Sequence, residues 1–138
     1  MAAIVSPDPA LERARMDPMA MDPADLKSLR EDLGLSVPTL AAAIGTSTTT
    51  VERWEMPPGN PNAYRISKAN AESFRRVVED TGRAVDEIVA SAGREIVVWS
   101  NDEEYRAAGG RYSAEWHRRV ARRAKERTGA AIVYAQPS

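Results

Sequence analysis

Apolar residues recur every three or four positions along most of the chain, in segments that serine, glycine or proline residues separate. The first segment begins at Asp22 and Pro23, a pair typical of a helix start, and ends at Gly34. Its apolar positions are Leu26, Leu29 and Leu33. Ser36 and Ser47 precede two further short segments and are typical N-caps. The pattern predicts three short helices between residues 22 and 55, followed by a loop rich in proline.

Residues 67–92 predict one long helix with an apolar face and a charged face. The apolar face consists of Phe74, Val77, Val78, Thr81, Val85, Ile88, Val89 and Ala92. Gly82 lies inside this segment and costs about 1 kcal/mol relative to alanine. The apolar pattern keeps its phase through this glycine, which favours one continuous helix over two short ones.

The last third of the chain predicts two short strands that flank two helices. Residues 95–99 and 131–134 are β-branched and aromatic, whereas Ser100 and Ser113 precede helical segments. Two strands do not form a stable sheet alone, so they pair with a second copy of the chain or are covered by helices. We favour a homodimer, with an interface formed by Ile96, Val98, Trp99, Ile132 and Tyr134.

The expected fold is mainly α and has four parts. Residues 1–20 contain prolines without periodicity and are expected to form a disordered arm, so Met1, Met16 or Met21 could each be the start. Residues 21–66 form an N-terminal helical bundle, and residues 67–93 form its long fourth helix. Residues 94–138 form a small C-terminal α+β (β-α-α-β) dimerisation part. Removing this last part is expected to leave a folded N-terminal unit.

Composition argues against most enzyme classes. The 138 residues include no cysteine and one histidine, His117, which excludes thiol nucleophiles, zinc fingers and most Ser-His-Asp arrangements. We therefore expect no catalysis, no metal and no cofactor. No apolar run approaches the roughly 20 residues that a membrane span needs. A cytoplasmic protein without a membrane partner is expected.

Residues 40–55 have the spacing of two helices that cross around a tight turn. Ala41 is small where the helices would cross, and Gly45 permits the turn. Val51 and Trp54 then face inward on the second of these helices. The side chains left on its outer face, where DNA would lie, are Thr48, Thr49, Glu52 and Arg53.

This stretch resembles the helix-turn-helix of the lambda-repressor-like (Xre/Cro type) family over residues 22–66. The resemblance implies base-reading positions at Ser47, Thr48, Thr49 and Arg53, and an internal ion pair between Arg30 and Glu55. The family's glutamine at the start of the second helix, which touches a phosphate, is replaced here by Val37, followed by Pro38. The expected DNA-binding residues are Ser47, Thr48, Thr49, Glu52, Arg53, Asn60 and Arg65.

The layout of the whole chain resembles the YdiL-like and anti-CRISPR-associated (Aca-type) repressors. Val97, Val98 and Trp99 match their strand, while Tyr105 and Trp116 match the two helices that follow it. The resemblance implies a C-terminal dimerisation module. It also implies an autoregulatory repressor of the phage or mobile-element type, which binds a palindromic operator in double-stranded DNA as a homodimer.

The net negative charge of residues 22–65 is also compatible with a second interpretation, in which the module binds protein. Between residues 22 and 65 there are four basic and six acidic side chains, so this region lacks the excess of positive charge that favours DNA. The alternative is a helix-turn-helix module, such as an antitoxin or adaptor, that binds protein without reading DNA. A basic helix over residues 114–127 offers phosphate contacts to DNA or RNA through Arg118, Arg119 and Arg122, or is only a solvated face.

Overall fold

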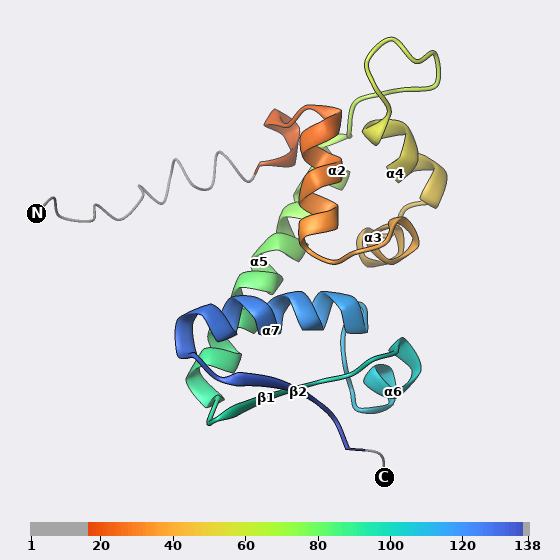
Figure 1. Ribbon diagram of the computed structural model, residues 1–138. Helices are drawn as coiled ribbons and strands as arrows, with labels where there is room; N and C mark the ends of the chain where they lie inside the picture. Colours follow the sequence, from red (N-terminus) through yellow and green to blue (C-terminus); the bar gives the residue numbers. More distant parts are fainter. Residues whose placement is uncertain (1–16, 137–138) are drawn as a thin grey trace, which may run out of the picture.

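The computed structural model describes residues 17–136 and is mainly helical, with one small two-stranded sheet (Figure 1). This confirms the mainly α fold class and the β-α-α-β order of the last third. The elements are η1 Pro18–Ala20, α2 Pro23–Asp32, α3 Val37–Ile44, α4 Thr48–Glu55, α5 Lys68–Ser91, β1 Glu95–Val98, α6 Asp102–Ala107, α7 Ala114–Thr128 and β2 Ala131–Tyr134.

The short 3-10 helix η1 occupies the end of the segment expected to be a disordered arm. The Asp17 side chain accepts a hydrogen bond from the Met19 backbone N–H at 3.0 Å, and Pro18 is buried. The boundary of the arm at residue 20 is therefore wrong, because residues 18–20 are ordered against the helices. Residues 1–16 lie outside the described part of the chain.

Serine side chains cap four of the helices, namely α3, α4, α5 and α7. Ser36 accepts the Thr39 N–H at 3.2 Å, and Ser47 accepts the Thr50 N–H at 3.1 Å. Gly45 ends α3 in the left-handed conformation, with φ of 74°, which a glycine adopts without steric cost. Asp22 occupies the N-cap position of α2, so the helix begins where expected, but the Asp22 side chain forms no capping hydrogen bond.

Helix α5 is one continuous helix that extends from the α2–α4 end of the molecule to the β-α-α-β end (Figure 1). Ser67 caps it by accepting the Asn70 N–H at 3.1 Å. Its buried residues are Ala71, Phe74, Val77, Thr81, Ala84 and Val85. The expected apolar face is thus confirmed, and Gly82 is accommodated on the exposed side.

The two strands pair with each other, in parallel, with Ile96 opposite Ile132 and Val98 opposite Tyr134. Helix α7 contacts both strands. Ile96 and Val98 are only 4% and 2% exposed, so their assignment to a dimer interface is wrong: they belong to the core of the single chain. Ile132 is partly buried against the same core, whereas Tyr134 is 61% exposed.

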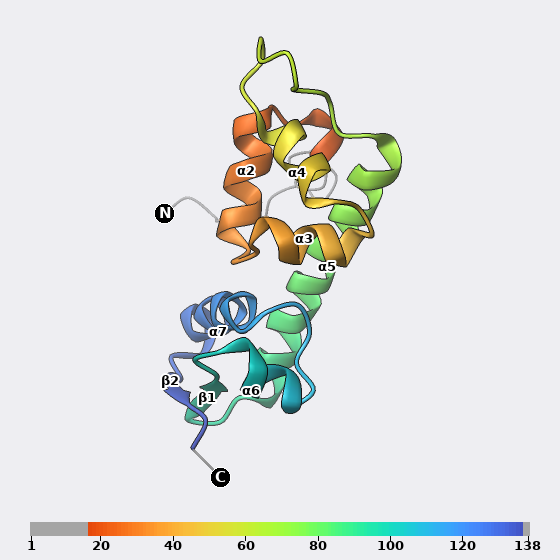
Figure 2. The same cartoon turned by 90° about the vertical axis from the view of Figure 1, so that its right-hand side faces the viewer.

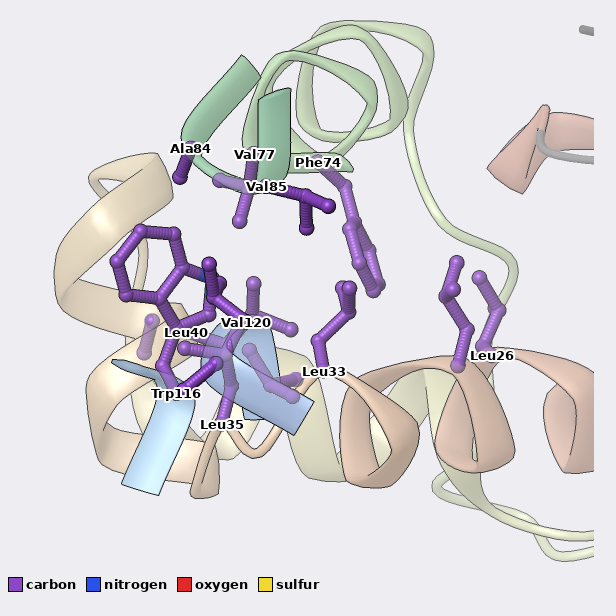
Figure 3. Close-up of a cluster of buried hydrophobic side chains, with 14 of the residues drawn as sticks. Leu26, Leu33, Leu35, Leu40, Phe74, Val77, Ala84, Val85, Trp116 and Val120 are labelled. Atoms are coloured by element: carbon purple, nitrogen blue, oxygen red, sulfur yellow. The ribbon is translucent and has the colours of Figure 1, made fainter. Parts of the chain in front are cut away.

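The two halves of the molecule share one core (Figure 3). Leu33, Leu35 and Leu40 from the α2–α3 region belong to the same cluster as Trp116 and Val120 of α7. Removing residues 94–138 would expose these leucines to water. The expectation that the N-terminal unit folds without the C-terminal part is therefore revised.

Gly34 lies where the α2–α3 corner meets α7. A Cβ atom at this position would lie 2.7 Å from Arg119 Cγ and 2.9 Å from the carbonyl oxygen of Glu115. The backbone φ of 73° also favours glycine. The residue that ends α2 thus also permits α7 to approach the N-terminal helices.

Candidate nucleic-acid interface

Helix α4 is anchored by its inner face. Val51 is 0% exposed and Trp54 is 1% exposed. The opposite face is solvent-exposed and carries Thr48, Thr49, Glu52 and Arg53, as expected. Figure 2 shows α3 and α4 on the side of the molecule that faces the viewer. The structure therefore brings four of the expected DNA-binding residues onto one exposed face.

An ion pair between Arg30 of α2 and Glu55 at the end of α4 holds this helix in place. Arg30 Nε donates to Glu55 Oε2 at 2.7 Å, and Arg30 Nη2 donates to Glu55 Oε1 at 2.9 Å. Arg30 Nη1 also donates to the Leu35 carbonyl oxygen at 2.9 Å. The hydrogen bond with Glu55 raises the pKa of Arg30, although burial opposes the shift. The expected internal pair is confirmed.

Arg53 is exposed and lies beside an aromatic ring that the sequence analysis did not single out. Its guanidinium carbon is 5.8 Å from the centre of the Tyr64 ring, and the Tyr64 N–H donates to the Arg53 carbonyl oxygen at 3.3 Å. A cation at this distance from an aromatic face is attracted to it. No sequence signal could locate Tyr64 here, because its position depends on the path of the loop between α4 and α5.

Three other expected DNA contacts lie at the ends of α4. The Ser47 hydroxyl already caps the helix, which limits it as a base reader. Asn60 accepts the Asn62 N–H at 2.9 Å and is exposed. Arg65 is also exposed, with Nη2 3.4 Å from the Met19 carbonyl oxygen. Asn60 and Arg65 line one cavity together with Trp54, so the loop places them close to the end of α4.

The N-terminus of α3 faces acidic residues of the C-terminal part. A crevice there is lined by Ser36 and Thr39 from the α3 side and by Asp102 and Glu115 from the other side. Asp102 is already engaged, since it accepts the Ala114 N–H at 2.7 Å. Arg118 lines the same crevice, so side chains of both charges lie beside this end of α3, where Val37 replaces the glutamine of the family.

The arginines expected to form a phosphate-binding surface on α7 differ in their contacts. Arg118 is partly buried and donates to the Trp99 carbonyl oxygen at 2.5 Å. Arg119 and Arg122 are exposed and form wide pairs on their own helix, with Glu115 at 3.7 Å and Glu126 at 3.8 Å. Arg118 thus holds the end of β1, and Arg119 and Arg122 alone retain open access to a phosphate among the three.

Trp99, Tyr105 and His117 form an aromatic cluster in the C-terminal part. Their ring centres are separated by 5.1 to 5.6 Å. Burial lowers the pKa of His117, and the charge of Arg118 lowers it further. The Tyr105 hydroxyl donates to the Arg111 carbonyl oxygen at 2.8 Å. Trp99, expected at a dimer interface, therefore packs within the chain and is only partly exposed.

Other classes of site receive no support in the described part of the chain. Residues 17–136 contain no group of three His, Asp or Glu side chains placed to hold a metal ion. Among the helices of these residues, none has the length and apolar character needed to cross a membrane. Comparison with models of known protein families and with curated proteins gave no match.

Proposed function

We propose that this chain is a sequence-specific DNA-binding transcriptional repressor that presents α4 to the major groove. The observation that carries the proposal is the exposed face of α4, whose opposite face is buried. Helices α3 and α4 are joined by a three-residue turn that begins at Gly45, as in a helix-turn-helix. This arrangement leaves the outer face of α4 available to a partner.

The chemistry of that face suits base edges. An arginine such as Arg53 can donate two hydrogen bonds to O6 and N7 of a guanine. The hydroxyls of Thr48 and Thr49 can contact bases or phosphates, and the Glu52 carboxylate can accept from the amino group of a cytosine. The exposed α4 face therefore offers both donors and acceptors to a DNA sequence.

A homodimer that binds a palindromic operator completes the proposal. A single helical unit with more acidic than basic side chains gains little from the release of counterions. Two linked units gain affinity because the second half-site is bound at high effective concentration. The exposed side chains of Val97 and Tyr134 on the sheet support a contact between copies. An autoregulatory role belongs to the same proposal.

Selection of bound sequences from random duplex DNA tests the proposal. The expected result is an enriched, two-fold symmetric motif whose binding weakens steeply as salt increases. Arg53→Ala should lower the enrichment of this motif, whereas Arg75→Ala, which changes an exposed arginine of α5, should leave it unchanged. A protein-interaction module would give no enriched motif and no salt-dependent binding to DNA, and that result would overturn the proposal.

A further inference from the structure

Strand β2 has one edge that no other strand of the described residues covers. The N–H groups of Ala131 and Ala135 donate to the carbonyl oxygens of Arg94 and Val98, at 2.9 and 2.8 Å. Because backbone groups alternate in direction along a strand, Ile132 and Tyr134 present theirs to the other side, away from β1. In Figure 2, β2 lies on the side of β1 that faces away from α6. Its edge is therefore open to a further strand.

The same strand carries an uncovered aromatic ring. Tyr134 is 61% exposed, more than any other large apolar side chain among the described residues. It lies opposite Val98, which is only 2% exposed. The core thus covers β1 on this face and leaves most of the Tyr134 ring in solvent. Another strand at the edge of β2 would give the ring a neighbour, and pairs of aromatic and β-branched residues stabilise a sheet.

Charge distinguishes the edge of β2 from that of β1. Edge strands are commonly protected from pairing by lysine, other charged residues or proline. Residues 129–138 contain no charged side chain, and β2 itself contains no proline. The open edge of β1 instead carries Glu95, and the Trp99 carbonyl oxygen beyond it already accepts from Arg118. The edge of β2 is thus the better surface for adding a strand.

We propose that β2 of a second copy of the chain pairs with this edge in antiparallel orientation, so that a four-stranded sheet crosses the dimer. A two-fold axis beside Val133 places Ile132 opposite Tyr134 of the partner subunit, and Tyr134 opposite Ile132 of the partner subunit. Each of these opposite pairs exchanges two hydrogen bonds. This register uses every open N–H and C=O group of Ile132 and Tyr134 in both copies.

A second copy fits this edge because the edge is its own complement. The two donors and two acceptors of Ile132 and Tyr134 match the same groups after a two-fold rotation. Val133 then faces Val133 of the partner subunit on the other side of the sheet, and no like charges meet near the axis. A partner chosen by its charge finds no opposite charge over residues 129–138. The homodimer belongs to the proposed function, so this inference rests on that proposal and names its interface.

Sedimentation equilibrium of the full chain tests the position of the axis. Val133 is only partly buried, and it is the residue that would lie opposite its own copy. Val133→Lys and Val133→Glu should each weaken dimerisation by about tenfold or more, because like charges then face each other. An equimolar mixture of the two variants should recover the dimer, which unfolded chains could not do.

Two control variants separate this effect from a general one. Val133→Thr keeps a neutral β-branched residue, and Ala90→Lys adds the same charge on the exposed side of α5. Both should dimerise as the wild-type chain does. A wild-type chain that stays monomeric over the micromolar range, or an unweakened dimer in Val133→Lys, would overturn the proposal.

Hydrogen exchange of single amides, followed by NMR spectroscopy, tests the pairing itself. The N–H groups of Ile132 and Tyr134 should exchange slowly in the wild-type dimer and rapidly in Val133→Lys. The Val133 N–H faces β1 and should stay protected in both chains. Rapid exchange of Ile132 and Tyr134 in a wild-type dimer would place the interface elsewhere and overturn the proposal.

These measurements fail separately from the selection of DNA sequences. If the dimer behaves as expected and no DNA motif is enriched, DNA binding fails and the β2 interface stands. If a two-fold symmetric motif is enriched and Val133→Lys leaves the dimer intact, only this inference fails.

Discussion

Helices α4 and α7 both carry arginines that the sequence places on an outer face, yet the two helices use these residues differently. On α4, Arg53 is exposed and lies beside the Tyr64 ring. On α7, Arg118 donates to the Trp99 carbonyl oxygen, and Arg123 donates to Asp32 of α2 at 2.6 Å. Arg118 and Arg123 therefore connect α7 to neighbouring elements, whereas Arg119 and Arg122 pair only within α7.

The comparison shows that the number of arginines on a helix does not measure its capacity for phosphate. A guanidinium that donates to a carbonyl or carboxylate of the same chain is held in one orientation and has fewer of its five N–H groups left for a ligand. In α4 the charged contact that stabilises the fold is the buried pair between Arg30 and Glu55, and the exposed face of the helix remains accessible to a ligand. In α7, Arg118 of the three arginines expected to bind nucleic acid is taken up by a structural contact, and Arg119 and Arg122 stay exposed.

The largest effect is expected when the buried contact of α4 is broken. Glu55→Ala leaves Arg30 without its partner in a site where the two side chains are 7% and 10% exposed. The expected loss is about 3–5 kcal/mol in the free energy of unfolding, measured by urea denaturation. Glu52→Ala, on the exposed face of the same helix, should change that free energy by less than about 0.5 kcal/mol. Equal losses in the two variants would contradict the assignment.

The next effect concerns DNA affinity and the exposed face of α4. Arg53→Ala should weaken binding to a selected operator by about 1–3 kcal/mol per half-site, because two hydrogen bonds to a guanine are lost. Binding to random DNA should barely change. The matched substitution on α7, Arg122→Ala, should change operator and random DNA affinity equally, if at all. Fluorescence anisotropy measures both affinities, and equal losses for Arg53→Ala would show that this residue only contacts a phosphate.

The features that the sequence predicted correctly are those that local chemistry determines. Caps such as Ser36 and Ser47 mark helix starts, and the phase of apolar residues reveals the buried face of α5. The exposed face of α4 follows from the inward positions of Val51 and Trp54.

The features that sequence reasoning missed depend on contacts between distant residues. The sequence of a short apolar strand does not specify which strand it pairs with, so the pairing of Ile96 with Ile132 inside one chain was not predicted. The contact between Gly34 and α7 and the position of Tyr64 beside Arg53 also require the three-dimensional path of the chain. The family resemblance was needed to predict the pair between Arg30 and Glu55, because these residues are 25 positions apart.

A smaller effect on stability should separate the arginines of α7 from one another. Arg118→Ala removes a charged donor from the Trp99 carbonyl oxygen and should lower the free energy of unfolding by about 1–2 kcal/mol. Arg122→Ala removes only a wide surface pair and should cost less than about 0.5 kcal/mol. Urea denaturation of both variants checks this difference. A similar cost for both would mean that the basic face of α7 is uniformly solvated.

The smallest expected effect is a dependence of stability on pH. It originates in the C-terminal part, because the only histidine of the chain, His117, lies there and α4 contains none. Burial and the charge of Arg118 lower the pKa of His117 in the folded chain, whereas the unfolded value is about 6.5. The unfolded chain then binds the proton more readily, so stability is fully present above about pH 6.5 and decreases as pH falls below it. A protonated ring would also have a donor at Nδ1, which is buried and has no partner among the described residues.

His117→Phe keeps a ring against Trp99 and Tyr105 but cannot titrate. Thermal unfolding between about pH 7.5 and 5.5 should therefore show a smaller loss of Tm in His117→Phe than in the wild-type chain, and identical losses would assign the pH dependence to the carboxylates instead.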